Sequence, residues 1–431
     1  MLANLLSFLT AYYATLYRAR RMTTEQRQQL QHSRLNRLLA TVQERNAFYR
    51  QRIDQTQAQL LAFPTVTKHD FLKDTPEHYI TAGYTAATLQ TEKSTGTSGN
   101  PFTVYFDPDY VRDRNLRFLR GLYATGYRWP MKMLLITGDR DRKSSPGRRW
   151  YYTSLKATVD DWYALLQEVK PDVVYGCTTP LRLLALHIKN KGLTSHRPDI
   201  IITTAETLDA DTRELLADTF KAEIFDFYGM TEMGLVAWEC TAHDGYHLAE
   251  DAILIERLPL PSSSDDTEAC SVPLRSSEKP PFRLVFTNLM LTAMPFIRYE
   301  SGDIAEGYNE APCLCGSHLP RIRRFEGRLI DSIRLPDGQL ISPYRFTCTL
   351  EEIPGMKRFR VIQRQVDQLL IEIECPDQED AADRLKQQAL ATARRIVPDT
   401  VRVDAVLLDS IPLAPGRKFR PVECRIGQPT P

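Results

Sequence analysis

The sequence predicts an α/β protein with a large N-terminal domain of β-sheets and packed helices, followed by a small, mobile α+β domain. Short β-rich runs such as residues 131–137 and 199–205 alternate with helical stretches. This alternation is typical of a largely buried sheet covered by helices. Residues 358–374, 378–396 and 400–408 then follow as strand, helix and strand, which predicts a separate compact unit of about 100 residues.

The boundary between the two domains is expected after Arg328. We assign residues 1–328 to the large N-terminal domain and residues 329–431 to the small C-terminal domain. Residues 259–281 are crowded with Ser, Pro and charged side chains, so we expect an exposed, mobile insertion between two strands. Residues 24–49 place leucines at near-helical spacing among polar side chains, which predicts an amphipathic surface helix.

Composition and charge exclude several classes of protein. The chain has 431 residues, of which 42% are hydrophobic and 25% charged, and these ordinary values exclude wholesale disorder. Its 55 basic and 54 acidic side chains give a net charge of +1, so no overall field attracts nucleic acid or an anionic membrane. Eight cysteines are too few for a disulfide scaffold. Without a convincing secretory leader, we expect a cytoplasmic location.

The N-terminal segment is apolar and needs a separate interpretation. Residues 2–17 carry no charge and are followed by Arg18, Arg20 and Arg21. The segment is short for a membrane span, which takes about 20 apolar residues, and a signal peptide has its positive charge before the apolar run. We favour a helix packed on the body of the protein, with contact at a membrane surface as the alternative.

Residues 94–101 form the first segment with chemical meaning. Four hydroxyl side chains and two glycines occur among these eight residues. Glycine lets backbone N–H groups approach a ligand closely, and hydroxyl groups donate to phosphate oxygens, so such a loop can wrap a polyphosphate. The segment lacks the spacing of a P-loop, and by itself such a run is more often an ordinary turn.

Two further turns carry side chains suited to a nucleotide. At the end of an apolar strand, Tyr228 offers a flat ring for a base, Thr231 a donor to phosphate and Glu232 an oxygen ligand for Mg²⁺. Asp303 follows a glycine in a tight turn, where its carboxylate can accept two hydrogen bonds from a ribose diol. Each of these turns is also common in proteins that bind no nucleotide.

The order and spacing of these segments carry more information than any one of them. The segments are STGTSGNP at residues 94–101, Ala205-Glu206, YGMTE at residues 228–232, Tyr299 with Gly302-Asp303, and Glu326-Gly327-Arg328. Together they resemble the adenylate-forming superfamily of acyl-CoA synthetases, and more narrowly its phenylacetate-CoA ligase branch with the coenzyme F-modifying synthetase relatives. The likeness covers most of the chain.

The resemblance implies ATP-dependent adenylation of a carboxylic acid, then transfer of the acyl group to the thiol of CoA or of a carrier protein. The implied cofactors are ATP, Mg²⁺ and CoA or phosphopantetheine. The implied site residues are Ser94, Thr95, Gly96, Thr97, Ser98 and Gly99 for the β- and γ-phosphates; Ala205, Glu206 and Tyr228 for adenine, beside Gly229 and Met230; Thr231 for the α-phosphate; Glu232 for Mg²⁺; and Asp303 and Arg328 for the ribose.

Three positions depart from the family pattern. Ile330 stands where an Asp is usual, two places after Arg328, which predicts a shifted or stiffened hinge for rotation of the C-terminal domain. Arg417 directly follows the glycine of the segment whose lysine assists adenylation, so Lys418 takes that catalytic role only if the alignment moves by one. Asn100 replaces a common lysine. Arginine keeps the charge but not the compact geometry of lysine, so altered or reduced adenylation is one reading.

A group of Cys and His residues stands apart from the nucleotide segments. Cys240, His247, Cys313 and Cys315 offer thiolate and imidazole, the ligands that Zn²⁺ prefers. Similar positions occur in phenylacetate-CoA ligase relatives, so we predict a structural zinc, with His243 as a substitute ligand. Four protein ligands leave no open coordination position, and the metal would therefore brace loops rather than activate water. The alternative is a set of free thiols and histidines.

The acid and the acceptor are less constrained by the sequence. A small aryl acid is favoured because aromatic and sulfur-bearing side chains occur where the acyl pocket is expected: Tyr123, Tyr127, Trp129, Tyr175, Phe227, Met230 and Trp238. CoA or an acyl carrier protein is the expected partner, and no nucleic acid is expected. The alternatives are an amide-forming ligase that passes the acyl group to an amine and a catalytically impaired nucleotide-binding protein. The oligomeric state stays open, with a homodimer as one candidate.

Overall fold

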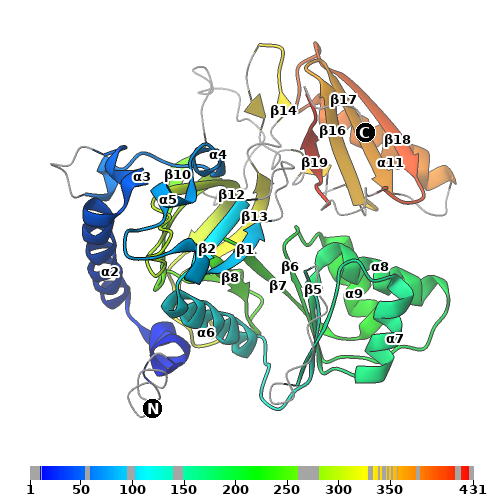
Figure 1. Ribbon diagram of the computed structural model, residues 1–431. Helices are drawn as coiled ribbons and strands as arrows, with labels where there is room; N and C mark the ends of the chain where they lie inside the picture. Colours follow the sequence, from blue (N-terminus) through cyan, green and yellow to red (C-terminus); the bar gives the residue numbers. More distant parts are fainter. Residues whose placement is uncertain are drawn as a thin grey trace.

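The computed structural model describes most of the chain, in two parts that we call the body and the C-terminal unit (Figure 1). The described residues are 10, 12–53, 59–94, 102–138, 149–260 and 281–328 in the body, and 333–426 in the C-terminal unit except for 338–339, 342–345, 347–348, 351–352, 357, 375–378 and 413–418. None of the helices in these ranges is long and apolar enough to cross a membrane.

An 11-stranded sheet forms the centre of the body, in the order β10-β11-β12-β13-β9-β8-β7-β6-β5-β3-β4. The strands from β4 to β7 are parallel, and those from β8 to β10 pair antiparallel. Their bounds are β3 (Met133–Ile136), β4 (Trp150–Thr153), β5 (Val173–Cys177), β6 (Ile200–Thr204), β7 (Glu223–Met230), β8 (Gly234–Glu239), β9 (Tyr246–Leu248), β10 (Ile253–Pro259), β11 (Phe282–Asn288), β12 (Tyr299–Asn309) and β13 (Arg321–Arg328).

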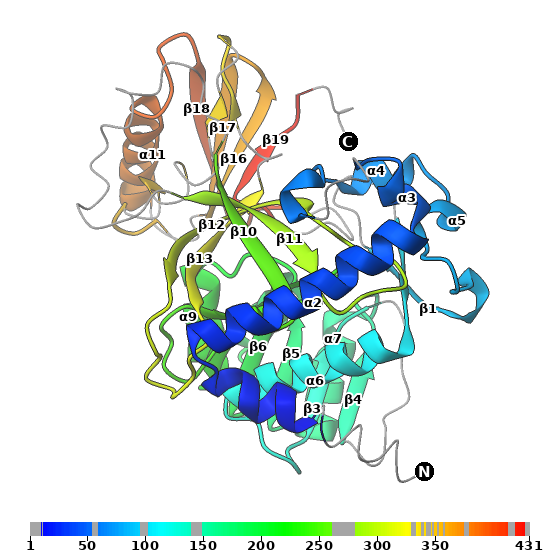
Figure 2. The ribbon, with the colours of Figure 1, turned by 90° about the vertical axis from the view of Figure 1, so that its left-hand side faces the viewer.

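Helices cover the body, and short helical turns connect them. The helices are α2 (Thr24–Arg45), α3 (Ala47–Arg50), α4 (Lys68–Leu72), α5 (Pro76–Tyr79), α6 (Pro108–Ala124), α7 (Val159–Val169), α8 (Thr178–Asn190) and α9 (Ala210–Phe220). The turns are η1 (Ala14–Arg18), η2 (Ala19–Arg21), η3 (Leu60–Ala62) and η4 (Ala86–Thr88). Figure 2 shows α2 lying across the outside of the body.

The parallel half of the sheet is buried on both faces, as the apolar runs predict. Along β3, Leu134 and Ile136 belong to the hydrophobic cluster under α7, α8 and α9, whereas Met133 and Leu135 belong to the main cluster on the opposite face. Successive side chains of a strand point to opposite faces. The alternation confirms the α/β prediction and leaves the carboxyl ends of these strands as one shared edge.

The helix expected over residues 24–49 is interrupted. Thr23 and Gln26 form a capping box at the start of α2, which ends at Arg45. Asn46 has an extended backbone, and its side-chain oxygen accepts a hydrogen bond from the backbone N–H of Tyr49, so that it caps the short α3. An asparagine that bonds to the backbone in this way favours a helix start over a helix interior.

The N-terminal segment is described from its last apolar turns onward. The turn η1 packs against α6, and Arg120 on α6 donates to the backbone oxygen of Thr15. The Tyr13 and Tyr17 side chains on the outer side are exposed. Contact with a membrane therefore stays a prediction about this outer side.

The C-terminal unit has its own sheet and its own hydrophobic cluster. Four strands are ordered β18-β17-β16-β19 and one helix packs on them: β16 (Arg358–Gln365), β17 (Gln368–Glu374), α11 (Glu379–Arg394), β18 (Arg402–Leu408) and β19 (Val422–Cys424). A two-stranded ribbon precedes them, β14 (Ile333–Arg334) and β15 (Leu340–Ile341). The single strand expected over residues 358–374 is a hairpin, because the chain turns at Val366 and Asp367.

The body also has a two-stranded hairpin, β1 (Gln90–Ser94) and β2 (Phe102–Phe106). Ser94 pairs with Phe102 at its end, so residues 95–101 connect two antiparallel strands. Strands β10 and β11 are also antiparallel partners. The predicted phosphate loop, Thr95 to Gly99, and residues 261–280 of the predicted insertion lie outside the described residues.

Candidate active site and metal centre

The carboxyl ends of β5, β6 and β7 meet at one edge of the sheet, which is where a ligand of an open α/β sheet usually binds. After β6, Ala205 takes a positive φ of 69°, and the chain turns along this edge. The Glu206 carboxylate accepts a hydrogen bond from the backbone N–H of Thr179 at 2.8 Å, and its backbone oxygen accepts one from the Thr178 hydroxyl. Glu206 therefore fixes the turn to the first residues of α8.

Tyr228 and Asp303 lie next to each other across this edge. The Tyr228 hydroxyl on β7 donates a hydrogen bond of 2.6 Å to Asp303 Oδ2 on β12. Phe325 on β13 stacks on the Tyr228 ring, with 3.9 Å between centroids and 16° between planes. The ring that was assigned to adenine thus has Phe325 on one face, and its hydroxyl is fixed by the carboxylate that was assigned to the ribose.

Glu232 lies in the turn between β7 and β8, and it is buried. Its Oε1 accepts a hydrogen bond of 2.8 Å from the Tyr299 hydroxyl, and its backbone oxygen accepts one from Asn288 Nδ2. The hairpin is tight, since a Cβ added at Gly229 would come within 2.7 Å of the Gly234 backbone oxygen. The turn is therefore pinned by two other strands, β11 and β12.

The structure places Tyr228 in contact with Asp303 on β12, and Glu232 in contact with Tyr299 on the same strand. Met230 and Thr231 are half-buried in the same hairpin. Arg328 is backbone-paired with Asp303 across β12 and β13. Other site residues of the prediction lie outside the described residues or have undescribed side chains: Ser94, Thr95, Gly96, Thr97, Ser98, Gly99, Arg417 and Lys418, and so do the divergent Asn100 and Ile330.

Sequence reasoning did not find Phe325 or Asn288. Phe325 directly precedes the Glu-Gly-Arg segment, but its stacking on Tyr228 depends on the pairing of β12 with β13. Asn288 ends β11, and nothing in its sequence neighbourhood indicates that it holds a turn 56 residues away. Both contacts are set by strand order, which a single sequence does not reveal.

A buried polar network surrounds Asp226 on β7 and lies on the same side of the strand as Tyr228, since the Tyr246 ring packs edge-on against Phe325. The Asp226 carboxylate accepts hydrogen bonds from the hydroxyls of Thr203, at 2.6 Å, and Tyr246, at 3.0 Å. The Glu239 carboxylate accepts from the backbone N–H of Asp226 and pairs with Arg213. Burial raises the pKa of Asp226 to about 7. This carboxyl group is therefore largely protonated at a pH where most carboxylates are charged.

The predicted metal ligands form one cluster. The ligand atoms of Cys240, His247, Cys313 and Cys315 all lie within 4.8 Å of one another. The Cys240 and Cys313 sulfurs are 3.8 Å apart, and the Cys315 sulfur is 3.3 Å from His247 Nε2. Two thiolates at tetrahedral corners around Zn²⁺ would be about 3.8 Å apart. The donor set and its spacing therefore fit zinc.

The surroundings of the cluster are also suited to a metal. His247 Nδ1 lies 3.2 Å from the backbone oxygen of Leu319, and such a contact leaves Nε2 as the ligating nitrogen. A hydrogen bond from Cys240, together with His247, lowers the pKa of the Cys315 thiol well below its ordinary value. His243, the substitute ligand of the prediction, is not in the cluster; its ring stacks on Phe225.

The aromatic residues expected to line an acyl pocket are divided by the structure. Trp129 is exposed, and Trp238 is buried beneath the Arg120 guanidinium. Tyr175 on β5 and Phe227 on β7, the two strands that flank β6, have ring centroids 6.2 Å apart, and the ring of Phe118 on α6 packs edge-on against both. Trp150 extends this aromatic group.

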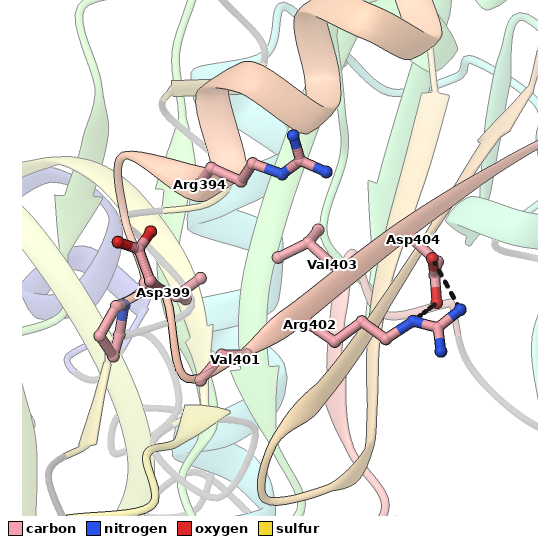
Figure 3. Close-up of a pocket in the computed structure, with 8 residues that line it drawn as sticks. Arg394, Asp399, Val401, Arg402, Val403 and Asp404 are labelled. Atoms are coloured by element: carbon pink, nitrogen blue, oxygen red, sulfur yellow. Dashed lines mark hydrogen bonds and ion pairs between the residues drawn. The ribbon is translucent and has the colours of Figure 1, made fainter.

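A cavity of about 270 Å³ lies in the C-terminal unit (Figure 3). The end of α11 and the start of β18 line it, with Arg394 on one side and Arg402 on the other. Arg402 pairs with Asp404 at 2.9 Å. Its lining contains none of the residues assigned to ATP, so this cavity is not part of the candidate nucleotide site.

Comparison with known proteins finds similar chains among acyl-CoA ligases. No model of a known protein family matches the sequence. A curated relative, the phenylacetate-coenzyme A ligase of Thermus thermophilus, is 25% identical over 358 residues, which is 78% of each chain. Among solved structures, 2-hydroxyisobutyryl-CoA ligase in the postadenylation state is 18% identical with a TM-score of 0.74, over 95% of this chain and 92% of that one.

Two further solved structures complete the comparison. The same 2-hydroxyisobutyryl-CoA ligase in the thioesterification state, in complex with the acyl-adenylate and CoA, gives a TM-score of 0.61 over 95% of this chain and 92% of that one, at 18% identity. An anthranilate CoA ligase in complex with anthranoyl-AMP gives 0.50 over 78% of this chain and 66% of that one, at 13% identity. In its fold and in the relatives that it matches, the chain resembles the adenylate-forming superfamily.

Proposed function

We propose that the protein joins a carboxylic acid to a thiol in two steps at the edge formed by β6, β7 and β12. A carboxylate oxygen of the acid attacks the α-phosphorus of ATP, and pyrophosphate leaves. The thiol sulfur then attacks the carbonyl carbon of the acyl-adenylate, AMP leaves, and the thiol proton passes to solvent. The observation that carries the proposal is that Tyr228 on β7 and Glu232 in the turn after it both contact β12, through Asp303 and Tyr299.

The roles proposed for the described residues follow from their placement. Asp303 presents a carboxylate to the ribose hydroxyls, and Tyr228 orients that carboxylate through its hydroxyl. Adenine would lie between Tyr228 and the turn of Ala205 and Glu206. Glu232 would contribute an oxygen ligand for Mg²⁺, which when bound offsets the negative charge of the phosphates. Catalysis of this kind depends chiefly on positioning and charge neutralisation.

The remaining roles concern segments outside the described residues. We assign phosphate binding to the hydroxyl-rich loop between β1 and β2, and the adenylation lysine to Lys418. These assignments rest on the resemblance, with Arg417 as the alternative cation. A catalytically impaired nucleotide-binding protein stays the rival function, because Arg417 and Asn100 stand where relatives often carry lysine.

A small aryl acid remains our proposed substrate class. It is supported by the cluster of Phe118, Trp150, Tyr175 and Phe227, whose rings meet edge to face. Such geometry is favourable for aromatic packing, and a flat ring is an apt partner for it. CoA is the favoured acceptor, in line with the ligases described above, and an acyl carrier protein or an amine is the alternative. A cytoplasmic location and a homodimer stay expectations.

We further propose that Cys240, His247, Cys313 and Cys315 hold one structural zinc. The sulfur and nitrogen spacings support this assignment. The ion would tie the end of β8 and strand β9 to the loop between β12 and β13, close to the strands that carry Tyr228 and Asp303. With four protein ligands, its contribution is to the folded shape of these loops.

The proposed reaction is tested by pyrophosphate release. The purified protein is incubated with Mg-ATP and with phenylacetate, anthranilate or 2-hydroxyisobutyrate in turn, first without an acceptor and then with CoA, carrier protein or an amine. Release that requires one of the acids supports the ligase, and the acceptor that speeds turnover identifies the second step. Tight nucleotide binding without release over a wider panel of aryl and fatty acids would favour the rival function.

A further inference from the structure

Two ion pairs cross from the body to the C-terminal unit. Arg182 on α8 pairs with Glu374 at the end of β17. Arg358 at the start of β16 lies opposite Asp209, the N-cap residue of α9, with 4.0 Å between Nε and Oδ2. Arg182 also lies 3.6 Å from Asp211 on the body, so the body contributes one cation and two anions, and the C-terminal unit contributes one cation and one anion. Complementary charges arranged in this way fix the register of two surfaces.

These four side chains are buried where the two parts meet. Arg182 and Arg358 are 5% and 4% exposed, and Glu374 and Asp209 are 10% and 16% exposed. Figure 1 shows the C-terminal unit facing α8 and α9 at this place. Ion pairs at this depth are screened little by salt. Removing Asp209 or Glu374 takes away one buried partner of the opposing arginine, and without Glu374 the Arg182 guanidinium keeps only the longer contact with Asp211, at 3.6 Å.

The pair of Arg358 and Asp209 is longer than a hydrogen-bonded ion pair. Arg358 Nε and Asp209 Oδ2 have no hydrogen-bond partner among the described residues, although they face each other at 4.0 Å. Burial lowers the pKa of Arg358, which reflects the cost of keeping this charge away from water. A buried pair with unsatisfied groups stabilises its arrangement weakly, as suits a contact that opens during a reaction cycle.

The same side chains hold both flanks of the segment that contains Lys418. Glu374 Oε2 accepts a hydrogen bond of 3.1 Å from the backbone N–H of Ile411. The Arg358 guanidinium lies 3.7 Å from the centroid of the Phe419 ring, and Phe419 directly follows Lys418. Adjacent Cα atoms are about 3.8 Å apart. Glu374 and Arg358, which form the ion pairs with the body, therefore also contact Ile411 and Phe419, the residues on either side of 412–418.

The comparison structures indicate which arrangement this is. One relative, 2-hydroxyisobutyryl-CoA ligase, gives a TM-score of 0.74 in the postadenylation state and 0.61 in the thioesterification state. Identity and coverage are the same in both comparisons, so the difference lies in how the parts of the relative are arranged. The described arrangement is the one closer to the postadenylation state.

We propose that Arg182, Asp209, Arg358 and Glu374 form a latch between the body and the C-terminal unit. The closed latch holds Ile411 and Phe419 on the C-terminal unit in the arrangement closer to the postadenylation state, and its opening frees the C-terminal unit for the thiol-transfer step. The four residues are positioning residues, since they act through the segment that they hold. This proposal rests on the proposed function for its chemical consequence, but the contact itself can be tested without any substrate.

Three variants separate the latch from general stability. Glu374→Gln removes one charge of the first pair. Asp209→Asn removes one charge of the second pair, and because asparagine caps helices as well as aspartate, α9 should keep its start. Glu372→Gln is the matched control: Glu372 lies two residues before Glu374 on β17, is 11% exposed and pairs with Arg360 inside the C-terminal unit.

Two measurements are made on the full chain. Small-angle X-ray scattering of the free protein should show a larger radius of gyration for Glu374→Gln and Asp209→Asn than for the wild type, and no change for Glu372→Gln. In single turnovers with phenylacetate, anthranilate and 2-hydroxyisobutyrate as probe acids, the two latch variants should release pyrophosphate at least tenfold more slowly. Transfer from a supplied acyl-adenylate to CoA should stay within twofold of the wild type.

The outcomes decide the two proposals separately. The latch is overturned if both latch variants match Glu372→Gln in scattering and in the ratio of the two half-reactions. If Glu374→Gln does not fold, Asp209→Asn with its retained cap decides the same question. If the wild type releases no pyrophosphate with any acid, the proposed function is overturned for these acids, and the scattering result alone supports or rejects the latch.

Discussion

Tyr228 and Asp303 are 75 residues apart in sequence and share a hydrogen bond of 2.6 Å. A hydroxyl that donates to a carboxylate makes a charge-assisted bond, which is stronger than a neutral one. The bond holds the carboxylate in one orientation before any ligand arrives. Asp303 is 9% exposed, so it is shielded from most of the solvent, and a small part of its surface stays accessible to a ligand.

Tyr228→Phe and Asp303→Asn should separate orientation from charge. Tyr228→Phe keeps the ring but removes the donor, and a bond to a charged group contributes about 1.5–3 kcal/mol. We expect a roughly 10- to 100-fold rise in the KM for ATP, measured by pyrophosphate release. Asp303→Asn should lower kcat/KM for ATP further, since the ribose loses a charged acceptor. Wild-type kinetics in both variants would remove these residues from the nucleotide site.

Glu232 illustrates how tertiary contacts change a mutational expectation. An exposed metal ligand could be replaced by alanine with little effect on the fold. Here the carboxylate is buried and accepts from Tyr299, so Glu232→Ala would also leave the tyrosine hydroxyl without its acceptor and lower the free energy of unfolding by about 1–3 kcal/mol. Loss of activity in Glu232→Ala must therefore be judged beside its melting temperature, with Tyr299→Phe as the structural control.

Asp226 should make stability depend on pH. Its folded pKa of about 7 lies above the ordinary value of 3.8, so the group favours the folded state fully below pH 4 and loses that contribution as pH rises through 7. The neutral isostere Asp226→Asn removes this dependence. We expect the free energy of unfolding of the wild type, relative to the variant, to fall between pH 4 and pH 7. Parallel pH profiles from urea unfolding would contradict the assignment.

At the scale of elements, the metal cluster joins segments that have little regular structure of their own. Cys240 follows β8, His247 lies in β9, and Cys313 and Cys315 lie in the loop between β12 and β13. The N-terminal segment also reaches this loop, because Arg20 donates to the backbone oxygen of Cys315 and its own backbone oxygen accepts from His318. Loss of the metal should therefore loosen both the loop between β12 and β13 and the N-terminal segment that contacts it.

Replacing one ligand tests the metal and its structural effect together. We expect elemental analysis to find about one zinc per chain in the wild type and little in Cys313→Ser, with a melting temperature lower by several degrees because the bound state is stabilised by the metal. Cys424→Ser is the control, since Cys424 lies in the C-terminal unit outside the cluster. Full zinc content in Cys313→Ser, or equal melting temperatures, would argue against a four-ligand structural site.

At the scale of the whole molecule, separate hydrophobic clusters indicate separate folding units. Two clusters fill the two sides of the large sheet, and a third lies within the C-terminal unit. The polar latch described above forms part of the contact between the units. The division between residues 328 and 329 stays a prediction, because residues 329–332 lie outside the described residues.

Calorimetry should test this division. If the C-terminal unit unfolds by itself, the melting curve will not fit a single two-state transition, and the smaller component should have an enthalpy of about 70 kcal/mol for roughly 100 residues. Glu374→Gln should lower the temperature of the smaller component because it breaks a contact with the body. A single two-state transition in the wild type would mean that the two parts unfold together.

The sequence by itself determined the parts whose signal is local. Short β-rich runs predicted β3 and β6 to within about two residues, since the burial of each residue follows from its place in one element. The turns at Val366 and Asn46 were missed, because competing backbone bonds and hairpin pairing interrupted a continuous pattern. The four zinc-type ligands were named from residue chemistry, and the structure gathers them.

Only the tertiary structure decided which distant side chains meet. It placed Phe325 on Tyr228, removed His243 from the metal cluster and paired Arg182 with Glu374. Arginine and glutamate are mostly exposed in proteins, so nothing in their sequence neighbourhood indicates that a particular pair is buried. Strand order and the packing of one unit on the other select these partners. Side chains interact with whatever lies next to them in space, and the number of residues between such partners in the sequence follows no rule.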